Sequence, residues 1–143
     1  MAGESRDPQA AASEYEQQVR LATKTSPSAQ PSLDLILLGL GEDGHTASLF
    51  HGAPSLWDQQ RVIAATQSPK DPPTRLTMTL AVINRASVIL FLIVGTGKAG
   101  VVRTILDSKT EAERQLPASL VKPEEGRVVW FLDRAAAAEL PKH

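Results

Sequence analysis

A chain of 143 residues with a net charge of −1 is long enough for one ordinary domain and implies no nucleic acid or other highly charged partner. It contains no cysteine, which excludes disulfides and thiolate chemistry. No apolar run is long enough to span a membrane, and the N-terminal segment lacks the apolar centre of a signal peptide. These features predict a soluble, cytoplasmic protein that has no membrane partner.

Apolar periodicity and turn residues divide the chain into alternating strands and helices. Helices are predicted at residues 9–23, 99–106 and 134–140. Strands are predicted at residues 33–38, 62–65, 87–94 and 127–132, and residues 75–80 form either a strand, which their alternation favours, or the start of a helix. Residues 1–8 are expected to be a flexible lead-in to one domain. The alternation predicts an α/β fold with a mainly parallel sheet and helices on both faces.

The stretch that follows the first strand is the most informative about function. The apolar run 33–38 has the length and character of a buried parallel strand, and Gly39, Gly41 and Gly44 come directly after it. His45 follows the last of these glycines. It is therefore expected outside the carboxyl end of a parallel strand, where α/β sheets usually place their chemistry.

A helix is expected to begin just beyond this glycine turn and to end near Phe50. Asp43, Thr46 and Ser48 are residue types that suit a helix entry, where free N–H groups favour a bound anion. Asp43 has two interpretations, since it either orients the His45 ring or a water molecule, or only caps the helix. Imidazole suits general base catalysis because its unperturbed pKa lies near neutral pH.

Two stretches, 39–44 and 95–100, match the pattern G-x-G-x-x-G between a predicted strand and a predicted helix. A dinucleotide site is disfavoured, because Glu42 and Asp43 would repel a pyrophosphate and the next strand ends without an acid for the ribose. Lys98 lacks the spacing of a phosphate-binding P-loop. The three histidines lack the spacing of a metal site, so neither a metal nor a cofactor is expected.

The stretch closely resembles the signature of 6-phosphogluconolactonases, and more distantly that of glucosamine-6-phosphate deaminases. The residues that carry the resemblance are Gly39, Gly41, Asp43, Gly44, His45, Thr46, Ala47, Ser48, Leu49 and Phe50. Thr-Ala-Ser after the histidine is the lactonase form. One departure is His51, where lactonases commonly have proline.

The resemblance implies a metal-free hydrolysis of a sugar-phosphate lactone, with His45 as general base and Asp43 beside it. It further implies that Lys98, in the turn Gly-Thr-Gly-Lys-Ala, binds the sugar phosphate. Lys70 and Arg75 flank a proline-rich loop that resembles the lactonase substrate loop, although in isolation each is equally well a surface charge. The expected substrate-binding residues are Gly41, Gly44, Thr46, Lys70, Arg75 and Lys98.

The resemblance covers only the C-terminal half to three-fifths of a typical lactonase. The family's Ser-Gly-Gly phosphate turn and Asp-Glu-Arg segment do not occur in this chain. A sheet cut in this way exposes an apolar strand edge and loses the helices of one face, which invites association with another chain. The chain alone is expected to be marginally stable and weakly active or inactive. Two other functions stay open, an inactive binding or regulatory remnant and an amino-sugar-phosphate isomerase or deaminase.

Overall fold

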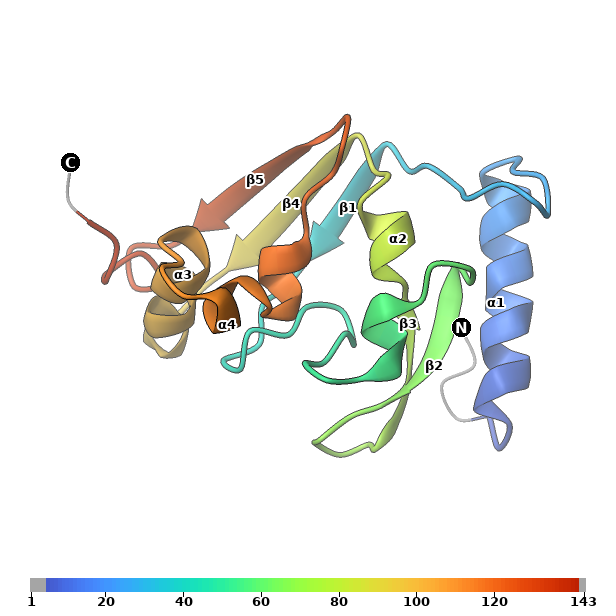
Figure 1. The fold of residues 1–143 in the computed structure, drawn as a ribbon, viewed down its shortest axis with the longest axis horizontal. Coiled ribbons are helices and arrows are strands. Elements are labelled where there is room, and N and C mark those ends of the chain that lie inside the picture. The colour runs from blue at the N-terminus through green and yellow to red at the C-terminus, as the bar shows by residue number, and fades with distance from the viewer. Residues whose placement is uncertain (1–4, 142–143) are drawn as a thin grey trace.

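The computed structural model describes residues 5–141 and contains a parallel sheet of three strands (Figure 1). These strands are β1 (Leu35–Leu38), β4 (Val88–Ile93) and β5 (Arg127–Leu132), in the order β1-β4-β5. In the register, Leu37 pairs with Leu90, and Leu90 pairs with Val129. The predicted α/β fold with a parallel sheet is therefore confirmed.

Two further strands form an antiparallel hairpin that is separate from this sheet. They are β2 (Ile63–Gln67) and β3 (Thr74–Met78), and the long helix α1 (Pro8–Ala22) packs against both. The ambiguous segment at 75–80 is thus mostly strand. The short helix α2 (Leu80–Ile83) begins two residues after β3 ends.

The remaining helical segments are short. They are η1 (Pro54–Trp57), η2 (Thr96–Lys98), α3 (Ala99–Leu106), α4 (Glu111–Arg114) and η3 (Pro117–Leu120). The prediction for α3 is confirmed at the expected bounds. None of the helices within residues 5–141 is long and apolar enough to cross a membrane.

The predicted helix after Gly44 is wrong, because residues 45–50 form a tight turn instead. Ala47 adopts a left-handed backbone with φ of 50°, and the Leu49 N–H donates to the Thr46 carbonyl. The Thr46 hydroxyl is buried and donates to the Gly39 carbonyl at 2.8 Å. The turn therefore folds back on the end of β1, and residues 45–50 provide no helix N-terminus.

The predicted helix at 134–140 is also wrong, because this segment consists of turns. Asp133 does cap its start, accepting from the Ala136 N–H at 2.7 Å, but the same carboxylate also accepts from the Gly95 N–H. A stretch this short has a high nucleation cost, and only Ala136 of its apolar side chains is buried. Helix propensity alone therefore does not fix a helix here.

One face of the parallel sheet is covered and holds the core. Ile89 and Phe91 of β4 are fully buried there, and the Phe91 ring stacks on Trp130 with 4.1 Å between ring centroids. The side chains of Val102 and Ile105 on α3 belong to the same cluster. Figure 1 shows the short helices gathered on this side.

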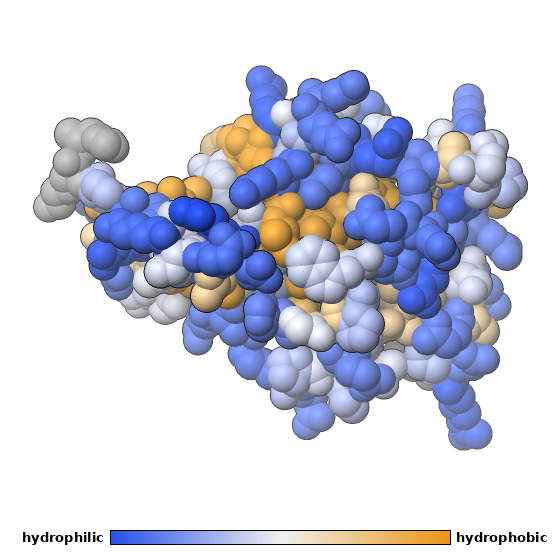
Figure 2. All heavy atoms as spheres, in the orientation of Figure 1, coloured by the Kyte–Doolittle hydropathy of each residue, from blue (hydrophilic) through white to orange (hydrophobic). Residues whose placement is uncertain are grey.

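The opposite face of the sheet carries exposed apolar side chains. Leu35 and Leu37 of β1, Leu92 of β4 and Phe131 of β5 alternate with buried or half-buried residues and are themselves more than half exposed. Figure 2, drawn from the same side as Figure 1, shows apolar surface among hydrophilic side chains near the middle of the view. Within residues 5–141 helices therefore cover one face only, as expected for a sheet that lacks a layer.

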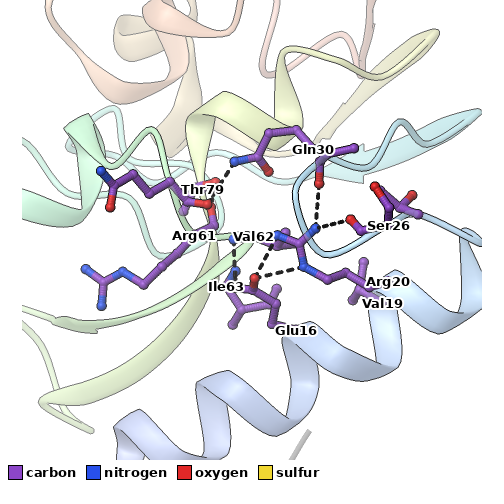
Figure 3. Close-up of polar contacts among 12 residues, drawn as sticks. Glu16, Val19, Arg20, Ser26, Gln30, Arg61, Val62, Ile63 and Thr79 are labelled. Carbon is purple, nitrogen blue, oxygen red and sulfur yellow. Dashed lines mark hydrogen bonds and ion pairs between the residues drawn. The ribbon is translucent and has the colours of Figure 1, made fainter.

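Helix α1 is fixed to the hairpin by a half-buried carboxylate (Figure 3). Glu16 accepts hydrogen bonds from the backbone N–H groups of Val62 and Ile63 at 2.8 and 3.3 Å. Its other oxygen accepts from Arg20, one turn further along the helix, and the Arg20 guanidinium also donates to the carbonyls of Ser26 and Ala29. One Glu–Arg pair therefore ties together the helix, the hairpin and the loop that leads toward β1.

We expect Glu16→Ala to lower the free energy of unfolding by about 1–3 kcal/mol, because it leaves buried backbone donors without an acceptor. Burial raises the pKa of Glu16, but the hydrogen bonds from Val62, Arg20 and Ile63 outweigh this and hold the pKa below its ordinary value of 4.5. The contribution of Glu16 is thus complete above pH 4.5 and is lost as the pH falls through the lower folded pKa. Urea unfolding between pH 7 and 3 is the measurement. The prediction would be contradicted if the free energy of unfolding varied with pH equally in Glu16→Ala and in the parent protein.

Candidate active site

A closed loop at the carboxyl end of β1 presents Asp43 and His45. The Gly41 N–H donates to the His45 carbonyl at 2.8 Å, and the Gly44 N–H donates to the Gly41 carbonyl at 3.0 Å. Gly44 has a φ of 81°, which favours glycine, and its carbonyl accepts from the Ala118 N–H of η3. These hydrogen bonds fix the loop that carries the Asp43 and His45 side chains.

The side chains of Asp43 and His45 form a hydrogen-bonded pair. His45 Nδ1 lies 2.5 Å from Asp43 Oδ1, and the His45 backbone N–H approaches the same oxygen at 3.4 Å. With Nδ1 donating to the carboxylate, the neutral ring keeps its lone pair on Nε2. Of the two interpretations of Asp43, the structure shows the contact with the ring, and the helix that it would cap is not formed.

The charge of Asp43 is maintained by its contact with His45. Burial raises the pKa of this carboxyl group, but the hydrogen bonds from the His45 ring and backbone outweigh burial and hold the pKa below its ordinary value. The carboxylate therefore stays ionised at neutral pH. A fixed negative charge at Nδ1 stabilises an imidazolium that forms when Nε2 takes up a proton.

Gly41 lies directly beneath this pair. A Cβ atom at position 41 would overlap Nδ1 and Cε1 of His45 and Oδ1 of Asp43. The absence of a side chain at this position therefore lets the ring and the carboxylate occupy their places. The sequence marks Gly41 as a turn residue, but its role here is to leave space for the pair.

Phe50 and Arg75 complete the surroundings of the His45 ring. The Phe50 ring is buried and tilted by 43° against His45, with 4.8 Å between the centroids. The Arg75 guanidinium carbon lies 5.9 Å from the centre of the Phe50 ring. Arg75 also donates to the carbonyls of Asp71 and Pro72 in the hairpin turn. The hairpin thus places the Arg75 guanidinium near the same Phe50 ring that packs against His45.

A second glycine-rich loop lies beside the first. Because β1 and β4 are parallel neighbours, their carboxyl ends meet at the same edge of the sheet, and η2 follows β4 there. Lys98, at the end of η2, has its Nζ 4.0 Å from Glu42 Oε1. A Cβ at Gly97 would approach this Glu42 oxygen to 3.0 Å. The two loops therefore meet through Lys98 and Glu42.

The predicted site residues differ in how they are placed. Gly41 contacts the Asp43–His45 pair and Arg75 lies close to it, whereas Lys98 is on the neighbouring loop. Thr46 and Gly44 are buried, Thr46 with its hydroxyl on Gly39 and Gly44 against Leu116. Lys70 is exposed in the hairpin turn. Their roles as substrate ligands stay predictions.

Sequence reasoning missed two neighbours of the site, Phe50 as a support for the histidine ring and Glu42 as the partner of Lys98. Glu42 was detectable, because parallel pairing of the two predicted strands brings both glycine turns to one edge. The position of Phe50 depends on the left-handed turn at Ala47, which the sequence does not reveal. Within residues 5–141 no group of three or more His, Asp or Glu side chains is placed to hold a metal ion.

We expect Gly41→Ala to separate Asp43 from His45, because the added methyl group occupies the space of the ring. The pKa of Asp43 then rises toward its ordinary value, which carboxyl carbon NMR measures as a function of pH. Gly39→Ala is the matched control, since a Cβ there meets nothing within 4 Å. An unchanged Asp43 titration in Gly41→Ala would contradict this account of the glycine.

Comparison with known proteins identifies the family of this chain. A family model described as glucosamine-6-phosphate isomerases/6-phosphogluconolactonase matches residues 1–130. Human 6-phosphogluconolactonase is 44% identical over 128 residues, covering 89% of this chain and 48% of the human protein. The probable 6-phosphogluconolactonase 1 of Arabidopsis thaliana is 40% identical over 141 residues, covering 92% of this chain and 53% of the plant protein.

Solved structures agree with these sequence matches. The 6-phosphogluconolactonase of Trypanosoma brucei superposes with a TM-score of 0.80 at 28% identity, over 96% of this chain and 55% of that one. The chain thus spans about half the length of the curated relatives it matches. Because the family model matches most of the sequence and the fold agrees, the chain belongs to the glucosamine-6-phosphate isomerase/6-phosphogluconolactonase family.

Proposed function

We propose that this chain carries the general base of a 6-phosphogluconolactonase, an enzyme that hydrolyses 6-phospho-D-glucono-1,5-lactone to 6-phosphogluconate. The observation that carries the proposal is the Asp43–His45 pair, held at 2.5 Å on a loop at the carboxyl end of a parallel strand. Relatives that are 40–44% identical are named lactonases, which favours hydrolysis over amino-sugar isomerisation.

The proposed reaction begins with a water molecule at His45 Nε2. The ring takes a proton from the water, whose oxygen attacks the lactone carbonyl carbon and forms a tetrahedral oxyanion. Backbone N–H groups and nearby cationic side chains stabilise the oxyanion. When the intermediate collapses, the bond to the ring oxygen breaks, and His45 returns the proton to that oxygen. Asp43 stabilises the imidazolium between the two transfers.

The phosphate of the substrate is assigned to the cationic side chains around the loops. Lys98 is the last residue of η2, at the same sheet edge as His45, and its Nζ lies 4.0 Å from Glu42 Oε1. Such a pair is loose enough for a phosphate to displace the carboxylate. Arg75 or Lys70 on the hairpin would hold the substrate from the other side and position its carbonyl carbon near Nε2.

The activity of this chain alone is proposed to be weak or absent. Relatives named lactonases are about twice as long, so part of their substrate contacts falls outside the matched region. What this chain retains is the base and its orienting carboxylate. Base catalysis and substrate positioning are therefore divided between the matched and the unmatched parts of the fold.

We expect any lactone hydrolysis above the spontaneous rate to fall by about 100-fold or more in His45→Ala, because the general base is removed. Asp43→Asn is expected to lower the rate as well, since the ring loses its orienting negative charge. The measurement follows loss of fresh lactone by NMR against a protein-free control. Release of ammonia from glucosamine 6-phosphate, with no lactone hydrolysis, would contradict the proposed reaction.

We expect Lys98→Ala to weaken binding of 6-phosphogluconate by about tenfold, because it removes the point charge assigned to the phosphate. Glu42→Gln is expected to tighten binding severalfold, since it removes the carboxylate that competes for Lys98. Both changes diminish at high salt because the groups are partly exposed. Titration followed by backbone amide NMR measures them, with Lys109→Ala, a surface lysine at the far end of α3, as the control. Equal affinities in Lys98→Ala and the parent would contradict this role.

A further inference from the structure

The carboxylate of Asp133 joins segments that meet just beyond the ends of β4 and β5 (Figure 1). Ile93 and Leu132 are the last pair of the two strands, and the Asp133 N–H donates to the Ile93 carbonyl at 3.2 Å. Both oxygens of the Asp133 carboxylate accept from the Gly95 N–H, at 3.1 and 3.2 Å. One of them also accepts from the Ala136 N–H at 2.7 Å. Asp133 therefore holds the chain that leaves β4 as well as the turn that follows β5.

Gly95 depends on this support because of its backbone conformation. Its φ of 97° and ψ of 152° belong to a region that is open essentially only to glycine. A Cβ at this position would meet nothing within 4 Å, so the glycine serves the backbone and not the space, in contrast to Gly41. Glycine also has more conformational freedom to lose than any other residue. An acceptor on the Gly95 N–H therefore restricts the direction in which the chain leaves β4.

This direction determines where Lys98 lies. The Gly95 carbonyl accepts from the Lys98 N–H at 3.2 Å, which closes η2 directly on the glycine. The side chain of Lys98 is held only loosely, because its Nζ lies 4.0 Å from the Glu42 carboxylate. The place of the lysine is therefore set mainly by the backbone of η2, and Asp133 reaches that backbone through a single glycine.

We infer that Asp133 is a positioning residue, which fixes Gly95 and thereby sets the place of Lys98 relative to His45. The inference rests on the proposed function, in which Lys98 binds the phosphate of the substrate. A carboxylate that acted only as a cap for the turn at Ala136 would affect stability and not phosphate binding. A carboxylate that acted only through its charge would repel the phosphate, so its removal would tighten binding.

The test titrates the full chain with 6-phosphogluconate and follows backbone amide NMR. Asp133→Ala is expected to weaken binding about fivefold and to speed hydrogen exchange at the Gly95 amide at least fivefold. Asp133→Asn keeps an oxygen acceptor, so its affinity is expected to stay within twofold of the parent. In a Lys98→Ala background, Asp133→Ala is expected to change the affinity less than twofold, because the carboxylate acts through the lysine. Glu16→Ala, which is expected to destabilise the fold elsewhere, is the control and is expected to leave the affinity within twofold.

Three outcomes would overturn the inference. They are an unchanged affinity in Asp133→Ala, tighter binding in both Asp133 variants, and an equal loss of affinity with and without Lys98. If Asp133→Ala does not fold, Gly95→Ala takes its place, because it disturbs the same backbone while open space surrounds the new methyl group. An unchanged affinity in Gly95→Ala would then overturn the inference in the same way.

The proposed function can fail separately. Binding that Lys98→Ala does not weaken would refute the phosphate site of the proposed function. The amide signals of Gly95 and Lys98 then decide the positioning on their own, without any ligand. A shifted Lys98 signal together with faster exchange at Gly95 in Asp133→Ala would support it, and unchanged signals would overturn it.

Discussion

The parallel pairing of β1 with β4 determines where the rest of the site lies. Residue 35 pairs with residue 88 across more than fifty residues of sequence, and from that register both glycine-rich loops emerge at one sheet edge. Asp43 and His45 come from the first loop and Lys98 from the second. The hairpin reaches the same region separately, through the contact of Arg75 with Phe50. A histidine, an acid and two cations are thus brought to one region from three segments by one strand pair and one aromatic ring.

The geometry of the pair itself is local. The hydrogen bonds that close the loop join residues 39–46 to one another. The loop and the turn after it are further supported by η3, by the hairpin and by Lys98 of η2. Gly41 leaves the space, Phe50 supports the ring, and Asp43 selects the tautomer. All of these residues lie between positions 41 and 50, so the Asp43–His45 pair is positioned by one short continuous segment of this chain.

The sequence predicts the strands, the long helix and the parallel sheet because their apolar patterns are strong and complete. The sequence wrongly predicts helices at residues 45–50 and 134–140, where the residue types suit a helix but the tertiary structure does not support one. In the first segment a buried threonine hydroxyl and a left-handed alanine turn the chain back. In the second, the caps and alanines are present, but there is no apolar stripe to bury. Helix propensity was correct at α3, where Val102 and Ile105 face the core.

The same contrast explains which parts of the site the sequence reveals. A histidine after a glycine turn is visible from the residues, and so is its acidic neighbour. Three other features depend on tertiary structure and are not visible in the sequence. They are the space that Gly41 leaves for the pair, the Phe50 ring beside His45 and the Glu42–Lys98 contact. The uncovered face lies between these cases, since its leucines are visible in the sequence but count as core until the fold leaves them exposed. The residues of β1 alone do not tell an edge strand from an interior strand, and only the strand order of the fold places β1 at the end of the sheet described by residues 5–141, with His45 on the loop beyond it.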